Sequence, residues 1–257
     1  MLIDERSKVP AVRPNAFPEI HWTPEMISRF WDWQSQYPEV YFTYLFGREI
    51  AYALRNYLIG RQRVLDFGCG VGYLLPYLCE YAPKVYGADL STQSIARTNE
   101  RLAGIRGFEG AFLVSDLQKH ETGFDAILAV EVVEHLYDED LDAALSTIRG
   151  MLSPDGIAIF TTPNDENREA NMILCPATGQ VFHRWQHVRS WSSASLSKRL
   201  RDRQFDVLHV IETNFAVRRP RTPVAYLKKI VKRLAFGDPG RPHLICIARA
   251  SRAGEPA

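Results

Sequence analysis

Three closely spaced glycines after a buried apolar run constrain this chain more than any other feature. The run is Arg63-Val-Leu-Asp-Phe-Gly-Cys-Gly-Val-Gly72, which places a carboxylate, Asp66, ahead of the glycines. A short apolar run of this kind predicts a buried strand. Glycines that follow it predict a tight turn, because a residue without a Cβ tolerates positive φ and lets a ligand approach the backbone. The segment therefore predicts a strand and a turn that cradles a nucleotide-like ligand.

The spacing of the glycines separates two kinds of nucleotide site. A dinucleotide-binding turn reads Gly-x-Gly-x-x-Gly and holds a pyrophosphate. Here Gly68, Gly70 and Gly72 place the third glycine one residue earlier. Asp66 would repel a pyrophosphate but suits a ligand that carries an amino group. Both features disfavour a dinucleotide oxidoreductase.

Two further carboxylates follow later apolar segments. Lys84-Val-Tyr-Gly-Ala-Asp-Leu90 predicts a second strand that ends at Asp89. The two oxygens of this carboxylate can accept hydrogen bonds from both hydroxyls of a ribose. Val114-Ser-Asp116-Leu117 is expected to end a third strand, with Asp116 placed to receive an exocyclic adenine amine.

Taken together, these segments resemble the class I S-adenosylmethionine-dependent methyltransferases over about residues 61–213. The resemblance implies an α/β fold, with a doubly wound, mostly parallel, seven-stranded Rossmann-like sheet whose closing strand is antiparallel. It implies that Asp66, Asp89 and Asp116 hold the methionine amine, the ribose and the adenine of S-adenosylmethionine. The implied cofactor-binding residues are Asp66, Gly68, Cys69, Gly70, Gly72, Asp89, Leu90, Asp116, Leu117 and Glu131.

Strand and helix patterns alternate along the chain as a parallel sheet requires. Ser91 is a candidate N-cap for a helix over 92–102, and Pro76 is compatible with the first turn of a helix over 73–81. A turn is expected at Pro154-Asp-Gly156. The other predicted segments are strands at 124–130, 157–161, 205–211 and 243–249 and helices at 141–152 and 193–202.

Length and composition favour one domain with additions. The 257 residues are 46% hydrophobic, enough to bury a full core. We expect a helical N-terminal lid over 1–60, a cofactor-binding core over 61–213 with an inserted loop at about 163–191, and a closing segment over 214–257. All five tryptophans lie in the N-terminal segment and the insert. Their rings either cover the sheet or form a lid over the reacting groups.

A Glu-x-x-Glu-His cluster, Glu131 to His135, follows the fourth predicted strand. Strand ends at the carboxyl edge of a parallel sheet face the ligand crevice. Two carboxylates and an imidazole on one turn can hold a divalent cation if another ligand joins them. With Thr162-Pro-Asn164 and His187, the cluster resembles the ubiquinone-biosynthesis O-methyltransferases and the enzymes that methylate the 2′-hydroxyl at the 3′ end of small RNAs. That resemblance implies a magnesium or manganese ion held by Glu131, Glu134, His135 and His187.

Two interpretations of the cluster need no metal. In one, His135 alone is the general base, because imidazole titrates near neutral pH. Glu131 then contributes its backbone to the methionine end of the cofactor, and Glu134 pairs locally. In the other, His135 is a packing residue. The candidate catalytic residues are His135, His187 and Glu134.

Oxygen is the favoured methyl acceptor, because the cluster suits a nucleophile that carries a proton. Methylation of nitrogen or carbon on a small molecule is the first alternative. The alternative from another class is a catalytically inactive cofactor-binding protein that acts on a partner.

The insert carries two more candidate binding features. Cys175-Pro-Ala-Thr-Gly179 matches a zinc-knuckle turn except that Thr178 replaces the second cysteine, which argues against a closed zinc site. His183, Arg184 and Arg189 are candidates for gripping an anionic acceptor, or for a solvated loop face.

A basic stretch runs from Asn214 to Gly237, with seven basic residues and no acidic one. Its segment 224–236 predicts a basic amphipathic helix that either touches an anionic membrane or packs on the sheet. The expected acceptor is a small molecule or a lipid- or glycan-linked group, and a formal net charge of +1 argues against nucleic acid. Without a long apolar run or a signal-peptide pattern, we expect a cytoplasmic protein, with membrane association through 224–236 as the alternative.

Overall fold

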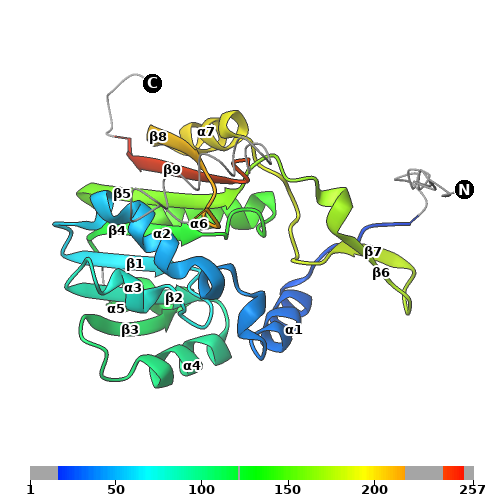
Figure 1. Ribbon diagram of the computed structural model, residues 1–257, viewed down its shortest axis with the longest axis horizontal. Helices are drawn as coiled ribbons and strands as arrows, with labels where there is room; N and C mark the ends of the chain where they lie inside the picture. Colours follow the sequence, from blue (N-terminus) through cyan, green and yellow to red (C-terminus); the bar gives the residue numbers. More distant parts are fainter. Residues whose placement is uncertain (1–16, 121, 218–239, 252–257) are drawn as a thin grey trace, which may run out of the picture.

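A seven-stranded sheet forms the centre of the molecule in the computed structural model, which describes residues 17–120, 122–217 and 240–251 (Figure 1). Its strands are β1 (Arg63–Phe67), β2 (Lys84–Asp89), β3 (Phe108–Leu113), β4 (Phe124–Val130), β5 (Leu152–Pro163), β8 (Phe205–Thr213) and β9 (His243–Ala250). The strand order is β3-β2-β1-β4-β5-β9-β8. Neighbours from β3 to β5 are parallel, and β9 is antiparallel to both β5 and β8. The predicted fold class, with its antiparallel closing strand, is confirmed.

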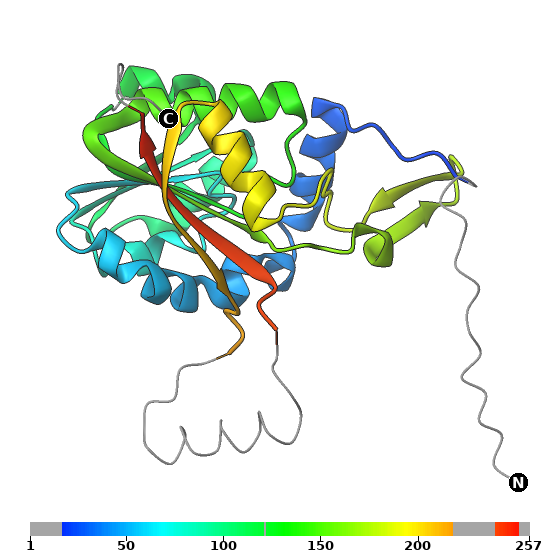
Figure 2. The same cartoon turned by 90° about the horizontal axis from the view of Figure 1, so that it is seen from above.

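Helices cover both faces of this sheet (Figure 2). The helices of the described residues are α1 (Pro24–Gln34), α2 (Phe42–Leu58), α3 (Leu75–Leu78), α4 (Thr92–Leu102), α5 (Val114–His120), α6 (Asp138–Met151) and α7 (Ser193–Asp202), with 3-10 turns η1 (Pro38–Val40) and η2 (Arg168–Asn171). Apolar residues of α2, α3 and α4 bury against one face, and those of α5, α6 and α7 against the other. The chain therefore forms an α/β/α sandwich of three layers.

The apolar runs of the strands explain this layering. Along β4, Ala126 and Leu128 belong to the core cluster under α2, whereas Ile127 and Ala129 belong to the cluster under α6. All four side chains are buried. Because side chains alternate across a strand, a strand covered on both faces needs a continuous apolar run.

Two helices begin at serines that cap them. At the start of α4, Ser91 Oγ accepts from Ser94 N–H at 3.1 Å. At the start of α7, Ser192 and Ser195 each bond the other's backbone N–H through their side chains. These bonds satisfy donors that the first helical turn leaves unpaired. The predicted bounds of both helices are confirmed, as are those of β4.

Two connections around the sheet differ from the prediction. The helix expected over 73–81 is the short α3, because the chain remains in the glycine turn until Leu74 and Pro76 then sits in the first helical turn. The turn expected at 154–156 is part of β5. Phe124 pairs with Leu152 but Ala126 pairs with Ile157, so the extra residues of β5 bulge out of the ladder.

The third predicted strand ends earlier than expected. Residues Val114 to Leu117 form the first turn of α5 instead of a strand end. Val114 and Leu117 both pack against the core cluster under α6. A helix brings residues three apart onto one face, whereas a strand would have turned Asp116 inward with Val114.

The insert after β5 forms a hairpin of β6 (Met172–Cys175) and β7 (Gln180–His183), which projects from the body of the molecule (Figure 1). The segment before α1 lies along β7. Ile20 N–H donates to Val181 O at 2.8 Å, and Val181 N–H donates to Pro18 O at 2.9 Å. Glu19 also forms an ion pair with Arg168 of η2. The N-terminal segment and the insert therefore form one substructure.

Helix α1 lies at the carboxyl ends of the parallel strands. Just past β2, Ser91 Oγ donates to Asp32 Oδ1 at 3.2 Å. Over the described residues, we find no helix with the length and hydropathy to cross a membrane. The basic helix expected over 224–236 lies outside the described residues.

Candidate functional site

The glycine turn after β1 has the backbone that its sequence predicts. Gly68, Gly70 and Gly72 all have positive φ, at +80°, +53° and +75°. At Gly68 an added Cβ would lie 2.5 Å from Val132 Cγ2. A side chain is therefore excluded both by backbone strain and by the loop after β4. The turn is packed tightly against the residues that follow β4.

Two predicted carboxylates lie beside this turn. Asp89 Oδ2 accepts from Gly70 N–H at 2.8 Å, and its Oδ1 accepts from Ser91 N–H at 2.9 Å. Burial, together with the charge of Asp89, raises the pKa of Asp66 to about 7. Burial also raises the pKa of Asp89, although its backbone hydrogen bonds oppose the shift. Asp66 and Asp89 thus meet at one edge of the sheet.

The other predicted cofactor residues differ in their access to this edge. Cys69 is buried and points its Sγ into the sheet, where an added Cβ at Gly87 would lie 2.9 Å away. Leu90 is 75% exposed at the end of β2. Leu117 is fully buried in the core, and Asp116 forms an ion pair with Lys119 at 2.9 Å within α5. Leu117 therefore offers a ligand only its backbone.

Glu134 and His135, which follow β4, lie next to His187, which follows the β6–β7 hairpin. One ligand atom of each lies within 4.8 Å of the other two, and His135 Nε2 lies 4.0 Å from Glu134 Oε1. Glu134 is 1% exposed, and neither of its carboxylate oxygens has a hydrogen-bond partner among the described residues. Burial and then the charge of Glu131 raise the pKa of Glu134 well above its usual range, against the opposing effect of the nearby Thr162 hydroxyl, which falls outside hydrogen-bond geometry. Because an unpaired buried carboxylate is costly, this group needs a proton or a cation.

His135 is held in one orientation by its neighbours. Its Nδ1 lies 3.4 Å from Gln186 O. Its ring meets those of Trp31 and His187 edge to face, with centroids 5.3 and 4.9 Å apart. Burial and the neighbouring His187 lower the pKa of His135 to about 3. His135 is therefore neutral near pH 7, and a proton on Nδ1 leaves Nε2 as a base or a metal ligand.

Glu131 is turned away from this group. Its Oε1 accepts from Thr161 Oγ1 at 2.9 Å, and its Oε2 lies 3.6 Å from His243 Nδ1. Its φ is +54°, a conformation that few residues other than glycine adopt. The predicted four-residue set is therefore assembled only in part, because Glu131 faces β5 and β9.

Glu166 is a candidate functional residue that our sequence analysis missed. Its Oε2 lies 2.5 Å from His187 Nδ1, and its Oε1 lies 3.3 Å from His183 Nε2. Burial raises the pKa of Glu166, but the two neighbouring histidines outweigh that effect and bring the pKa to about 2. The available signal in the sequence is position, since Glu166 follows the carboxyl end of a parallel strand.

Gln186 is a second residue that the sequence did not reveal. It is buried and has a φ of +62°. Its Oε1 accepts from Trp31 Nε1 at 3.1 Å, and its Nε2 donates to His135 O at 3.1 Å. The side chain thus links α1 to the turn that carries His135.

The three residues expected to grip an anion do not converge. His183 is fully buried against Glu166. Arg189 Nη1 pairs with Asp138 Oδ1 at 2.9 Å. Arg184 lies over the ring of Trp185, with its guanidinium carbon 5.1 Å from the ring centroid. Each side chain is engaged separately, so the predicted grip is not formed.

The segment that resembles a zinc knuckle forms the turn of the β6–β7 hairpin. Gly179 N–H donates to Cys175 O at 2.9 Å, which closes the turn. Within the part of the chain that the structure describes, the candidate metal-ligand groups include no cysteine. The turn therefore forms through its own backbone hydrogen bond.

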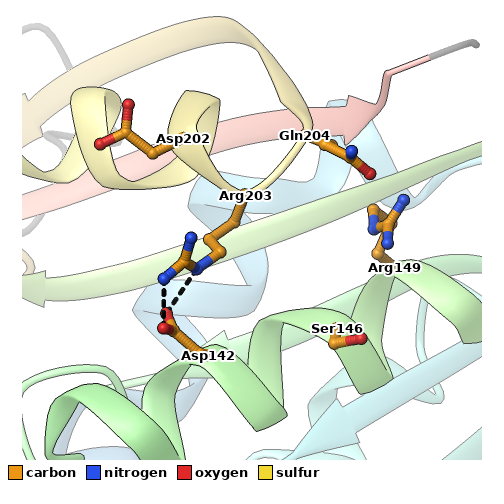
Figure 3. Close-up of a pocket in the computed structure, with 6 residues that line it drawn as sticks. All are labelled: Asp142, Ser146, Arg149, Asp202, Arg203 and Gln204. Carbon is orange, nitrogen blue, oxygen red and sulfur yellow. Dashed lines mark hydrogen bonds and ion pairs between the residues drawn. The ribbon is translucent and has the colours of Figure 1, made fainter.

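A hollow lies between α6 and α7 (Figure 3). It is lined by Asp142, Ser146, Arg149, Asp202, Arg203 and Gln204, none of which is a predicted site residue. Arg203 donates to both carboxylate oxygens of Asp142. These two charges satisfy each other, and the hollow shares no residue with the group around His135.

Comparison with known proteins identifies the family. Residues 33–210, more than half of the 257, match a family model described as a methyltransferase domain. An uncharacterized methyltransferase of Mycobacterium tuberculosis is 30% identical over 137 residues, which cover 50% of this chain and 68% of that protein. The ubiquinone biosynthesis O-methyltransferase of Sinorhizobium medicae is 33% identical over 125 residues, which span 48% of this chain and 49% of that enzyme.

Solved structures share the fold at low sequence identity. A structure of a DhpI–SAH complex has a TM-score of 0.58 and 19% identity, covering 87% of this chain and 94% of that one. A chain from the complex of the Haloferax volcanii Trm112 methyltransferase activator with a putative methyltransferase has a TM-score of 0.61 and 18% identity, covering 88% and 99%. With the family match and the curated relatives, the chain belongs to the class I S-adenosylmethionine-dependent methyltransferases.

Proposed function

We propose that the protein transfers the methyl group of S-adenosylmethionine to an oxygen atom, with Glu134, His135 and His187 on the acceptor side. The observation that carries this proposal is the buried Glu134 carboxylate, which has no hydrogen-bond partner among the described residues and lies beside two histidines. An oxygen acceptor must lose its proton as it is methylated. Imidazoles next to a carboxylate suit that need.

On the donor side, we assign the glycine turn and its two neighbouring carboxylates to the cofactor. Asp66 would pair with the methionine amine, and Asp89 would accept hydrogen bonds from the ribose hydroxyls. The exposed Leu90 side chain would lie against the adenine, and Asp116 and the backbone of Leu117, both in α5, would hold it. Glu131, with its unusual φ, contributes its backbone at the methionine end. Gly68, Cys69, Gly70 and Gly72 approach the cofactor through their backbone.

The acceptor-side group also fits a divalent cation. Glu134, His135 and His187 would supply one carboxylate and two imidazoles, and Glu134 is the buried charge that such an ion would neutralise. Bound there, magnesium or manganese would lower the pKa of the acceptor hydroxyl and orient it. Glu131 lies outside this set because its carboxylate accepts a hydrogen bond from Thr161.

The route through His135 alone is the second candidate. His135 is neutral near pH 7, as a general base must be. The burial that keeps it neutral also makes it a weak base, since proton transfer is most efficient when the pKa lies near the working pH. That weakness favours the cation-assisted route.

The aromatic side chains on the acceptor side favour a flat acceptor molecule. Trp31 lies against His135, and Tyr137 stacks on His21 with ring centroids 4.5 Å apart. We propose that α1 is a lid over a phenol, or over a glycan- or lipid-linked group, instead of over nucleic acid. The relatives named as ubiquinone biosynthesis O-methyltransferases support oxygen as the acceptor. Methylation of nitrogen or carbon is the alternative, and a catalytically inactive cofactor-binding partner protein is the rival from another class.

The donor assignment is tested by titrating S-adenosylhomocysteine in a calorimeter. We expect Asp89→Ala to weaken binding at least about a hundredfold, because two hydrogen bonds to a charged acceptor contribute about 1.5–3 kcal/mol each. Asp140→Ala, an exposed change in α6, is the matched control. Circular dichroism checks the fold of both variants. Wild-type affinity in a folded Asp89→Ala protein contradicts the assignment.

The acceptor-side assignment is tested with Mn²⁺ on chelated protein and with methyl transfer to a panel of phenols. We expect His187→Ala and His135→Ala to lose Mn²⁺ binding but to retain S-adenosylhomocysteine binding. The exposed His209→Ala is the control for both. Methyl transfer that is indifferent to Mn²⁺ selects the route through His135 alone. Turnover that survives in His135→Ala refutes both routes.

A further inference from the structure

The protonation of His183 follows from its hydrogen bonds. This histidine is fully buried, and its Nδ1 accepts from Trp185 N–H at 3.3 Å and from His187 N–H at 3.2 Å. A ring nitrogen that faces two backbone donors carries no proton of its own. The ring proton of His183 is therefore on Nε2, which lies 3.3 Å from Glu166 Oε1. This contact falls outside hydrogen-bond geometry, so the Nε2–H of His183 interacts with the Glu166 carboxylate through its charge, and His183 cannot reverse that role.

Glu166 receives further donors from the same side of the molecule. Asn171 Nδ2 donates to its Oε1 at 3.4 Å. Its Oε2 lies 2.5 Å from His187 Nδ1, and the rings of His183 and His187 stack with centroids 4.4 Å apart. A carboxylate held in this way accepts a hydrogen bond from a protonated Nδ1 of His187. His187 then keeps its lone pair on Nε2.

We propose that Glu166 is a positioning residue that holds His187 as its Nδ1–H tautomer, and that His183 in turn fixes Glu166. The role in methyl transfer rests on the proposed function, in which His187 acts with Glu134 and His135. Nε2 is then the nitrogen of His187 that accepts a proton or binds a cation. A carboxylate on the other ring nitrogen is a common way to fix a histidine for either task.

A cation between Glu166, His183 and His187 is the competing interpretation. One ligand atom of each lies within 4.8 Å of the others. The hydrogen bonds argue against it, because His183 Nε2 carries the ring proton and Nδ1 faces backbone donors. His187 Nδ1 is also engaged by Glu166. The group with Glu134 and His135 is therefore the better cation site of the two.

The tautomer of His187 can be measured directly by long-range proton–nitrogen NMR on protein with labelled histidine, assigned with His187→Gln. We expect a protonated Nδ1 and an unprotonated Nε2 in wild type. Glu166→Gln should shift His187 toward the Nε2–H tautomer, because a glutamine amide can donate to Nδ1. Glu169→Gln, an exposed change in η2, is the matched control and should leave the signals unchanged. An Nε2–H tautomer in wild type overturns the proposal without any variant.

A second readout is the affinity for Mn²⁺ alone. We expect Glu166→Gln to weaken it about 10–100-fold while S-adenosylhomocysteine binding is retained. His183→Asn keeps an acceptor for the backbone donors but removes the Nε2–H beside Glu166, and should weaken Mn²⁺ in the same direction. An unchanged His187 tautomer in Glu166→Gln overturns the proposal. If wild type binds no Mn²⁺, the metal part of the proposed function fails, whereas the tautomer experiment still decides the role of Glu166.

Discussion

Asp66 places a carboxylate inside the sheet, where it is only 2% exposed. Its pKa of about 7 reflects first its burial and then the charge of Asp89 nearby. An apolar residue or an amide would fill this position in β1 without that cost. A carboxylate retained here is consistent with a ligand that brings a positive charge, such as the amine of S-adenosylmethionine.

This shift predicts how stability depends on pH. The pKa of Asp66 is about 7 in the folded protein and about 3.9 in an unfolded chain, so between these values the folded state holds a proton that the unfolded state lacks. The contribution of Asp66 to the free energy of unfolding is therefore present below about pH 4 and is lost as pH rises to about 7. We expect Asp66→Asn to remove this decline in urea denaturation at pH 5 and pH 8.

The exposed Asp140→Asn change is the control, and it should keep the wild-type difference between the two pH values. If Asp66→Asn also keeps that difference, the carboxylate does not titrate in this range and the explanation fails.

At the scale of elements, features set by adjacent residues could be predicted from those residues, whereas features set by contacts between distant segments were predicted only through the family resemblance or were missed. The glycine turn, α4 with its Ser91 cap and the apolar run of β4 each depend on a few adjacent residues. The start of α5 depends instead on Val114 and Leu117 reaching the same core cluster, which a strand pattern concealed. Glu166 could not be assigned because its histidine partners approach only after the insert folds back.

Two glycines, one of them in the turn after β1, allow the cost of close packing to be separated from the cost of backbone strain. Gly68 and Gly60 both have positive φ, +80° and +88° respectively. An added Cβ would meet Val132 at Gly68 but would meet nothing within 4 Å at Gly60. We expect Gly60→Ala to cost about 1–2 kcal/mol, the penalty for positive φ alone. Gly68→Ala should cost about 1–3 kcal/mol more, because Val132 must move. Chemical denaturation of both variants measures the difference, and equal losses would show that Val132 yields freely.

At the scale of the whole molecule, α1 joins parts of the chain that are distant in sequence. Trp31 reaches Gln186 in the insert, and Gln186 reaches the backbone of His135. The helix also contacts the end of β2 through Asp32 and Ser91. The helix therefore contacts residues next to both the proposed donor side and the proposed acceptor side of the site.

This connection predicts unequal roles for two neighbouring tryptophans. Trp31→Phe would leave the buried Gln186 Oε1 without the N–H of Trp31, which we expect to cost about 1–3 kcal/mol of stability. Trp33 is 57% exposed, and Trp33→Phe should stay within about 0.5 kcal/mol of wild type. Urea denaturation of the two variants makes the comparison, and a cost shared equally would mean that the bond to Gln186 contributes little.

With α1 as the proposed lid, the pairing of residues 18–20 with β7 would also bear on how substrates enter and products leave. A flap hinged at one end can swing aside, but α1 is tied at its start to the hairpin and continues at its end into the helices on the sheet. A helix held at both ends would open by rolling about its own axis or by releasing one of its two attachments. Two backbone hydrogen bonds and the Glu19–Arg168 ion pair form the tie at the hairpin. The pace of product exchange would then be set by a hairpin outside the group around His135.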